Sequence, residues 1–143
     1  MRFVSANAGQ IQAIRYYKAA GETGPHVGRI WSSTGQLLAS VTFTNETASG
    51  WQQQSLAAPL FITAGISYTV SVNANSYYAL TSNGFSAAIS NGGLTASIGA
   101  GVYNDDTGLY PALIYQNENY FRDVVFVAGT STPTNRPGVQ RLR

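Results

Sequence analysis

The feature of this sequence that most constrains its fold is a set of short segments in which β-branched or aromatic residues alternate with polar ones. The clearest of these segments are residues 9–18, 27–31, 67–73 and 120–128. A period of two places alternate side chains on one face of a strand. Turn residues separate the segments, and none has the 3.6-residue period of a helix. The pattern predicts an all-β fold, an antiparallel, jelly-roll-like β-sandwich of eight to nine strands.

Further strands follow from the turns. Residues 36–43 are expected to pair back on the preceding strand after the turn at 32–35, and residues 51–60 form a strand that Pro59 ends or confines to an edge. Residues 77–80 are expected to pair back after a turn. The Ser-, Asn-, Gly- and Ala-rich stretch at 82–101 shows no alternation from which strands can be placed.

The composition indicates a folded sheet domain. Hydrophobic residues make up 44% of the 143 residues and charged residues only 10%, so the chain lacks the Glu, Lys and Arg that cover exposed helices. Nine Tyr, six Phe and two Trp are more than a disordered chain would carry. We expect one β-sandwich domain over residues 1–128, followed by a linker or tail rich in Thr, Pro and Arg over residues 129–143.

The charge distribution argues against a nucleic acid partner. The net charge is +2, but three of the eight basic residues lie in the last eight positions, which leaves five basic and six acidic groups in residues 1–128. No basic stripe is available to follow a phosphate backbone. No apolar run approaches the ~18 residues of a membrane span, so membrane insertion is not expected either.

The chain contains no cysteine, which excludes disulfides, thiolate metal sites and thiol catalysis. It opens directly on a strand pattern at residues 1–4 and shows no signal peptide. We expect it to be a segment of a longer exported protein, located outside the cell or on the cell surface.

Several stretches, in order, resemble a bacterial family, the DUF4082 domains. They are IRYYKAAGETGPHVGRIWSSTGQLLASVTFTNETASGWQQ, then SYTVSV, YYALTSNGF, GVYNDDTGLYP and NYFRDVVF. The resemblance covers roughly residues 3–128. The resemblance implies an exported sandwich similar to carbohydrate-binding modules, in multidomain proteins beside glycan-active or adhesive domains. It also implies a structural or ligand-contacting role for His26, in the G-x-H-x-G loop. The chain departs from the family pattern at two places. Members commonly carry Trp at the position of Phe121, and they have an aromatic–Gly pair near the position of Asn104–Asp105.

Catalysis has few candidates. His26 is the only histidine, and no nucleophile-elbow pattern accompanies it, so a Ser-His-Asp triad is not expected. Glycoside hydrolysis would need two carboxylates across a cleft. The available carboxylates are Glu22, Glu46, Asp105, Asp106, Glu118 and Asp123. We expect a protein that is not an enzyme, although a carboxylate pair facing one cleft would change that expectation.

The oxygen-rich turn at 104–108 is a candidate metal site. Asp105 and Asp106 could bind Ca²⁺, which takes carboxylate and carbonyl oxygens. The EF-hand spacing is absent, and a simple Asx turn is the alternative interpretation.

The aromatic residues are the most informative functional feature. Sugar rings present an apolar C–H face, so glycan sites stack them on exposed Tyr or Trp, while amides and charged groups contact the hydroxyls. Trp31, Trp51, Phe43, Tyr68 and Phe126 lie in strand patterns and are expected in the core. The candidate ligand-binding residues are His26, Tyr77, Tyr78, Asn83, Tyr103, Tyr110 and Tyr115.

Three function classes remain open. The first is a non-catalytic carbohydrate-binding module that attaches a larger exported protein to a polysaccharide. The second is a structural subunit or adhesin module that assembles with copies of itself or with neighbouring domains, as in a fibre or surface layer. The third is a glycan-active enzyme.

Overall fold

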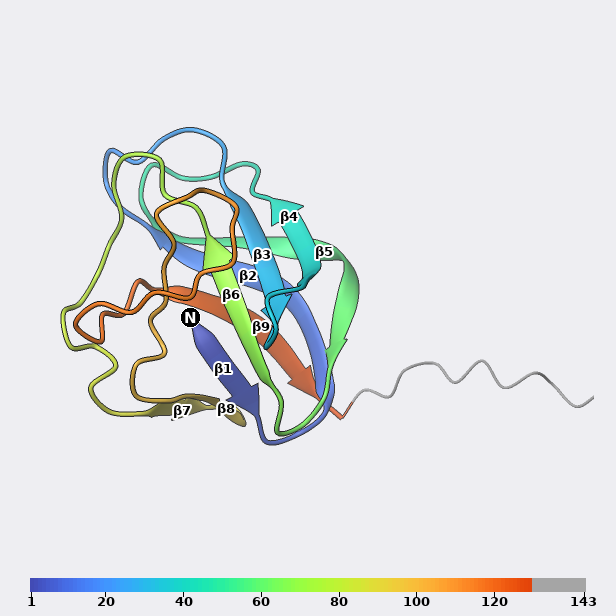
Figure 1. Cartoon of the computed structure of the whole chain (residues 1–143). Coiled ribbons are helices and arrows are strands. Elements are labelled where there is room, and N and C mark those ends of the chain that lie inside the picture. The colour runs from blue at the N-terminus through green and yellow to red at the C-terminus, as the bar shows by residue number, and fades with distance from the viewer. Residues whose placement is uncertain (130–143) are drawn as a thin grey trace, which may run out of the picture.

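The computed structural model describes residues 1–129 as two antiparallel β-sheets packed face to face (Figure 1). The strands in this part of the chain are β1 Arg2–Ser5, β2 Gly9–Lys18, β3 Val27–Ser32, β4 Leu37–Thr42, β5 Gly50–Ile62, β6 Ser67–Val72, β7 Ile89–Asn91, β8 Leu94–Ala96 and β9 Arg122–Ala128. The prediction of an all-β antiparallel sandwich with eight to nine strands is confirmed. Within residues 1–129 there is no helix that could cross a membrane.

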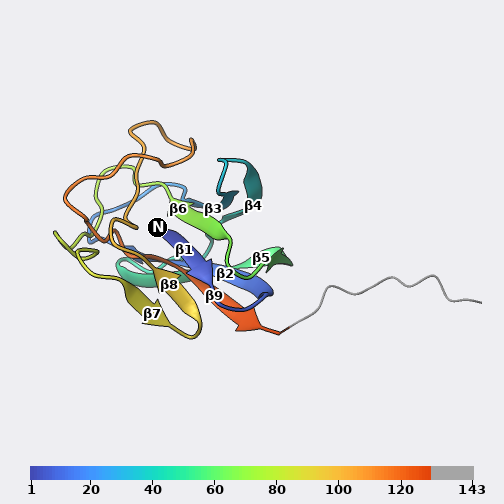
Figure 2. The ribbon, with the colours of Figure 1, turned by 60° about the horizontal axis from the view of Figure 1, so that its bottom comes forward.

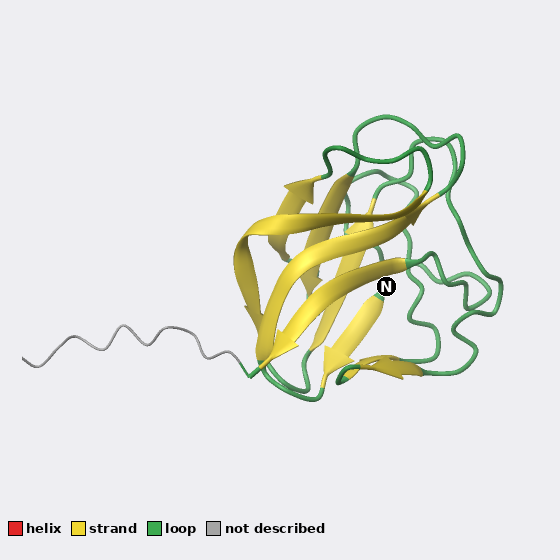
Figure 3. Ribbon diagram, turned by 180° about the vertical axis from the view of Figure 1, so that it is seen from behind, coloured by secondary structure: helices red, strands yellow, loops and turns green. Residues whose placement is uncertain are grey.

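The two sheets differ in size. The larger has the strand order β4-β3-β6-β1-β8-β7 and the smaller has the order β5-β2-β9. The β7–β8 hairpin forms one edge of the larger sheet (Figure 2). The smaller sheet is the nearer layer when the molecule is viewed from behind (Figure 3). Its inner face covers the core, and its outer face carries exposed side chains such as Tyr17.

Strand β2 shows how the alternation directs side chains. Ile14 and Tyr16 are buried between the sheets, whereas Arg15 and Tyr17 alternate with them and point outward. The register against both neighbours shifts between Ile11 and Ala13, where a bulge bends the strand. This bend allows a long central strand to curve around the core.

The core lies between the two sheets and is apolar. Its buried members are Phe3, Ile11, Ile14, Tyr16, Ile30, Phe43, Leu56, Ile62, Tyr68, Val70, Val72 and Val124. The expected core positions of Phe43 and Tyr68 are confirmed, Trp31 is also buried, and Phe126 packs against the core while partly exposed. A smaller apolar cluster forms around Phe85, Ala96 and Ala100 beneath the long loops.

Trp51 was expected in the core, and this prediction is wrong. Its side chain is 45% exposed, because Gln52 and Leu56 are the residues of β5 that face inward. A strand that turns position 52 inward must turn position 51 outward. The indole therefore lies on the outer face of the smaller sheet.

Three further predictions concern chain segments. Residues 77–80 form no strand, although Thr81 makes an isolated bridge with Asn119. The unassigned stretch 82–101 contains the short strands β7 and β8. The expected linker or tail at 129–143 lies outside the described residues from position 130 onward.

Candidate functional site

The candidate site is a cleft of about 530 Å³ at one end of the sandwich. One wall is the end of β6 with the following segment 73–78, and the other is formed from residues 102–120. Four tyrosines line the cleft together with amide, carboxylate and guanidinium groups. The tyrosines are Tyr78, Tyr103, Tyr115 and Tyr120.

Three of these rings form one aromatic cluster. The Tyr120 ring centroid lies 5.9 Å from that of Tyr78 and 6.3 Å from that of Tyr103, with both pairs near edge-to-face. Burial raises the pKa of Tyr120, and its hydrogen bond with Glu118 raises it further, so the phenol remains neutral. Tyr78 and Tyr115 are more than half exposed. The cleft thus presents exposed rings supported by a half-buried one.

The polar lining is closely balanced in charge. Arg29 and Arg122 contribute two positive groups, and Asp105, Asp106 and Glu118 contribute three negative ones. The 104–108 turn closes as an Asx turn, in which the Asp106 N–H donates to Asn104 Oδ1 at 2.9 Å. A cleft of this kind suits a neutral ligand with many hydroxyl groups.

The same turn holds few of the oxygen ligands that calcium needs. Asp105 and Asp106 are exposed, and the Asn104 side-chain oxygen already accepts the turn hydrogen bond. Calcium needs 6–8 oxygen ligands. Residues 1–129 contain no group of three or more His, Asp or Glu side chains that could hold a metal ion. The donor set therefore fits the Asx turn better than a cation.

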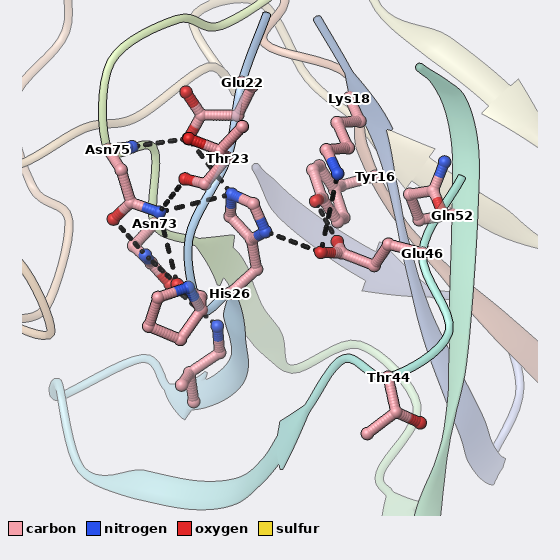
Figure 4. Close-up of polar contacts among 12 residues, drawn as sticks. Tyr16, Lys18, Glu22, Thr23, His26, Thr44, Glu46, Gln52, Asn73 and Asn75 are labelled. Atoms are coloured by element: carbon pink, nitrogen blue, oxygen red, sulfur yellow. Dashed lines mark hydrogen bonds and ion pairs between the residues drawn. The ribbon is translucent and has the colours of Figure 1, made fainter. Parts of the chain in front are cut away.

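A buried polar network lies beside the cleft and is built around His26 (Figure 4). His26 Nδ1 lies 2.9 Å from Glu46 Oε2, and Nε2 lies 3.0 Å from Glu22 Oε1. The two ring nitrogens therefore bridge two different carboxylates. Tyr16 donates its hydroxyl to Glu46, and Lys18 pairs with the same carboxylate at 3.7 Å. The network therefore joins β2 to the two loops that carry Glu22 and Glu46.

Glu22 connects this network to the wall of the cleft. Its carboxylate accepts backbone N–H bonds from Asn75, Ser76 and Tyr77 at 2.5–2.9 Å. Burial alone would raise the pKa of Glu22, but these bonds and the one from His26 outweigh it and lower the pKa to about 2. One carboxylate thus fixes the backbone immediately before Tyr78.

Arg122 holds two further backbone segments in place at the edge of the cleft. Its Nε and Nη2 donate to the Val72 carbonyl at 3.3 and 3.1 Å, and Nη1 donates to the Tyr120 carbonyl at 2.6 Å. Its guanidinium also lies over the Tyr16 ring, 5.6 Å from the centroid. Burial lowers its pKa to about 10, so it is still charged at neutral pH. The side chain holds the end of β6 and the Tyr120 backbone together at the edge of the cleft.

Residues 1–122 of the chain match the model of a family described as a domain of unknown function, DUF4082. The chain belongs to the DUF4082 family. No curated protein and no solved structure matches it. The family membership expected from the sequence is confirmed, and the function must be argued from the site of this DUF4082 domain.

The cleft brings together five of the residues proposed from the sequence. Tyr78, Tyr103, Tyr115, Asp105 and Asp106 all line it. They come from segments more than twenty residues apart, which the DUF4082 fold places side by side.

The other four candidates lie elsewhere in the DUF4082 domain. His26 has no exposed surface, so it can position loops but cannot contact a ligand. Tyr77 is 58% exposed but faces Gly21 outside the cleft. Tyr110 packs its ring on Trp31, at 5.8 Å between centroids. Asn83 is exposed in a turn with φ 58°, and its N–H donates to the Gln116 carbonyl.

Several cleft residues were not predicted from the sequence, and three of them are Tyr120, Arg122 and Arg29. Tyr120 and Arg122 belong to a segment that the alternation assigned to the final strand, and β9 begins only at Arg122. Arg29 lies in β3, and its guanidinium reaches Gly108 of the Asx-turn segment. The Tyr-Phe-Arg sequence at 120–122 was the available signal, because such a mixture is unusual for a uniformly buried strand.

Proposed function

We propose that this chain is a non-catalytic carbohydrate-binding module that works outside the cell as part of a larger exported protein. The observation that carries the proposal is the cleft, in which exposed tyrosine rings lie beside amide, carboxylate and guanidinium groups. The location and the larger parent protein are supported by the sequence resemblance alone.

The chemistry of the cleft suits a sugar chain. Tyrosine rings offer an apolar face to the C–H groups of a pyranose, while the phenol hydroxyls remain available for hydrogen bonds. At the rim of the cleft, Arg29 offers hydrogen-bond donors to sugar hydroxyls, and Asp105 and Asp106 offer acceptors. Because the lining charges nearly cancel, a neutral polysaccharide fits better than a polyanion.

The carboxylates support binding without hydrolysis. Glu22 and Glu46 are both engaged by His26 beneath the surface, and Asp123 pairs with Arg15 at 3.5 Å. Asp105 and Asp106 are neighbours in one exposed turn rather than facing each other across a gap. Glu118 is buried and hydrogen-bonded to Tyr120.

The test is a glycan-array screen of the domain, followed by calorimetric titration of each hit. We expect saturable binding that falls at least tenfold in Tyr78→Ala and Tyr103→Ala. Tyr77→Ala is the matched control, since Tyr77 is equally exposed but lies outside the cleft. Equal losses in all three variants would argue against the cleft, and no binding to any glycan would reject the proposal.

A second candidate function is assembly with other protein chains. Strand β5 forms an edge of the smaller sheet over 13 residues and contains no charged residue. Edges without charges are open to pairing with another strand, although Pro59 interrupts this one. Concentration-dependent oligomers in light scattering, combined with an empty glycan array, would favour this function.

A further inference from the structure

The outer face of the smaller sheet carries two parallel rows of side chains with different chemistry. Tyr17 of β2 lies opposite Trp51 of β5, and its N–H donates to the carbonyl of Phe121, just before β9, at 3.0 Å. These three residues form an aromatic row across the sheet. Two residues along β2, Arg15 pairs with both Gln53 and Asp123, which gives a polar row. This outer aromatic surface consists of Tyr17, Trp51, Phe121, Arg15, Gln53 and Asp123.

The aromatic row is a continuous cluster that reaches solvent. The ring centroid of Tyr17 lies 5.7 Å from that of Trp51 and 6.3 Å from that of Phe121, and Trp51 lies 6.4 Å from Phe121. Trp51 is 45% exposed and Tyr17 is 39% exposed. Exposed contiguous aromatic patches in soluble domains are characteristic of interaction sites. The Trp51 ring is nearly perpendicular to both neighbours, so the surface is stepped and does not match a flat crystalline face.

The polar row determines the charge of the ligand that fits. The Arg15 guanidinium lies 4.7 Å from the Trp51 ring centroid, and its Nη1 lies 3.5 Å from Asp123 Oδ2. The cation site over the indole is thus already occupied, which disfavours a second cation such as a quaternary ammonium. The pair is locally neutral and offers donors and acceptors side by side, as adjacent sugar hydroxyls require.

Phe121 is held in this row at a conformational cost. Its φ is +54°, in the left-handed region that bulky residues rarely adopt. The Phe121 N–H donates to Asn119 Oδ1 at 2.8 Å, and its carbonyl accepts from Tyr17, so both backbone groups are fixed. The strained residue separates Tyr120 and Arg122, which line the cleft, and directs its own ring to the outer face. Strain of this kind concentrates at functional positions.

We infer that the outer aromatic surface is a second binding site for one neutral pyranose residue of a soluble polysaccharide. The sugar's C–H face rests on the Tyr17 ring and its edge contacts the perpendicular Trp51 indole, while its hydroxyls contact Arg15, Asp123 and Gln53. This inference extends the proposed function to a surface that shares no residue with the cleft. The two can therefore be tested separately.

Trp51 supplies the direct test, because the other tryptophan, Trp31, is only 6% exposed. The Trp31→Phe variant makes Trp51 the sole tryptophan, whose emission can be excited selectively over that of the tyrosines. We would titrate it with laminarin, barley β-glucan, arabinoxylan and galactomannan. We expect at least one of them to give a saturable blue shift and a twofold or greater reduction in acrylamide quenching. If Trp31→Phe does not fold, iodide quenching of the native chain reports the exposed Trp51 selectively.

Variants then assign the signal to a surface. In the Trp31→Phe background, Tyr17→Ala should weaken the fluorescence titration at least tenfold, whereas the cleft variant Tyr103→Ala should leave it unchanged. Ile98→Ala is the matched control, since Ile98 is 66% exposed and belongs to neither surface.

The outcomes separate the two proposals. A polysaccharide could bind by calorimetry in a Tyr103-dependent manner and leave Trp51 emission and quenching unaltered. That result would reject the second site and retain the cleft. A Trp51 signal that persists in Tyr103→Ala supports the second site even if the cleft binds nothing. A silent Trp51 with all four polysaccharides and no calorimetric binding would reject both.

Discussion

His26 Nε2 and Glu22 Oε1 lie 3.0 Å apart, and both side chains are almost completely excluded from solvent. The same carboxylate holds three consecutive backbone N–H groups at residues 75–77. The pair therefore connects a buried charge to the geometry of the cleft wall. Because the pair is buried, it can affect ligand binding only by positioning the segment that carries Tyr78.

Replacing Glu22 tests this connection. Glu22→Gln removes the charge and turns an amide NH₂ toward backbone N–H groups of residues 75–77, so we expect a loss of about 3 kcal/mol in the free energy of unfolding. Denaturant unfolding measures it. Asp105→Asn, in the exposed turn, is the control and should change stability by less than about 0.5 kcal/mol. Equal effects of the two substitutions would show that Glu22 does not organise the loop.

Acid should destabilise the domain through the same residue. A carboxyl group whose pKa is lower in the folded state stabilises the fold above its unfolded pKa and loses that contribution as the pH falls. For Glu22 the window runs from 4.5 down to about 2, and the full contribution is about 3 kcal/mol. Glu46, whose pKa is also lowered, adds in the same direction.

Urea unfolding midpoints measured between pH 6 and pH 2 would follow this loss. The pH dependence should be visibly shallower in Glu22→Gln, because the substituted side chain does not titrate. An unchanged slope in the variant would contradict the assignment to Glu22.

Phe121 predicts an unusual order of stability between two substitutions. Both Phe121→Gly and Phe121→Ala remove the ring, but only glycine adopts φ +54° without a steric penalty. We expect the glycine variant to be more stable than the alanine variant by about 1 kcal/mol, as judged by thermal unfolding. The reverse order would mean that the backbone relaxes once the ring is removed.

Gly101 should tolerate no side chain at all. A Cβ there would lie 1.7 Å from the Glu118 carbonyl oxygen, so Gly101→Ala must displace the segment that lines the cleft. We expect a loss of about 3 kcal/mol or more. Gly65→Ala is the control, because Gly65 has φ +74° but no atom within 4 Å and should cost only about 1 kcal/mol.

Calcium should not stabilise the domain. Because the turn at Asp105 and Asp106 presents only two exposed carboxylates, we expect the same melting temperature with millimolar calcium and with EDTA. A calcium-dependent rise that disappears in Asp105→Asn would restore the metal site as a hypothesis.

The sequence predicted the strands in which apolar alternation is strong, and it missed those formed by pairing alone. β6 carries Tyr68, Val70 and Val72 at every second position, and β2, β3 and β9 are rich in β-branched or aromatic residues, so these strands can be recognised locally. β7 and β8 have three residues each, and β8 is held by pairing with β1 about ninety positions earlier. Such a strand carries no local pattern to detect.

Trp51 shows why a face can be assigned wrongly. The segment Trp-Gln-Gln-Gln offers one large apolar residue, which a local argument places inward. Gln52 is buried instead because its amide bonds to Thr47, with the Thr47 N–H donating to Gln52 Oε1 at 2.9 Å. The signal was Leu56, whose parity with position 52 sets the inward face of β5.

The candidate site was predictable by residue type and not by position. Tyr77, Tyr78 and Tyr115 are exposed in loops, whereas Tyr103 and Tyr110 are only partly exposed, and the convergence of the cleft tyrosines depends on long-range contacts. His26 is held by Glu46, twenty positions later, and the segment before Tyr78 is held by Glu22, more than fifty positions earlier. Spacing along the chain does not reveal such partners.

The strand order carries a consequence for biosynthesis. β2, the centre of the smaller sheet, takes β9 as one of its two neighbours, and β1 is enclosed between β6 and β8. During translation, residues 9–18 therefore leave the ribosome more than a hundred residues before residues 122–128 complete their sheet. Contacts so far apart in sequence slow folding. The larger sheet needs residues up to Ala96, but the smaller sheet cannot close until β9 has emerged, and until then the apolar face of β2 is an exposed surface on which chaperones can act.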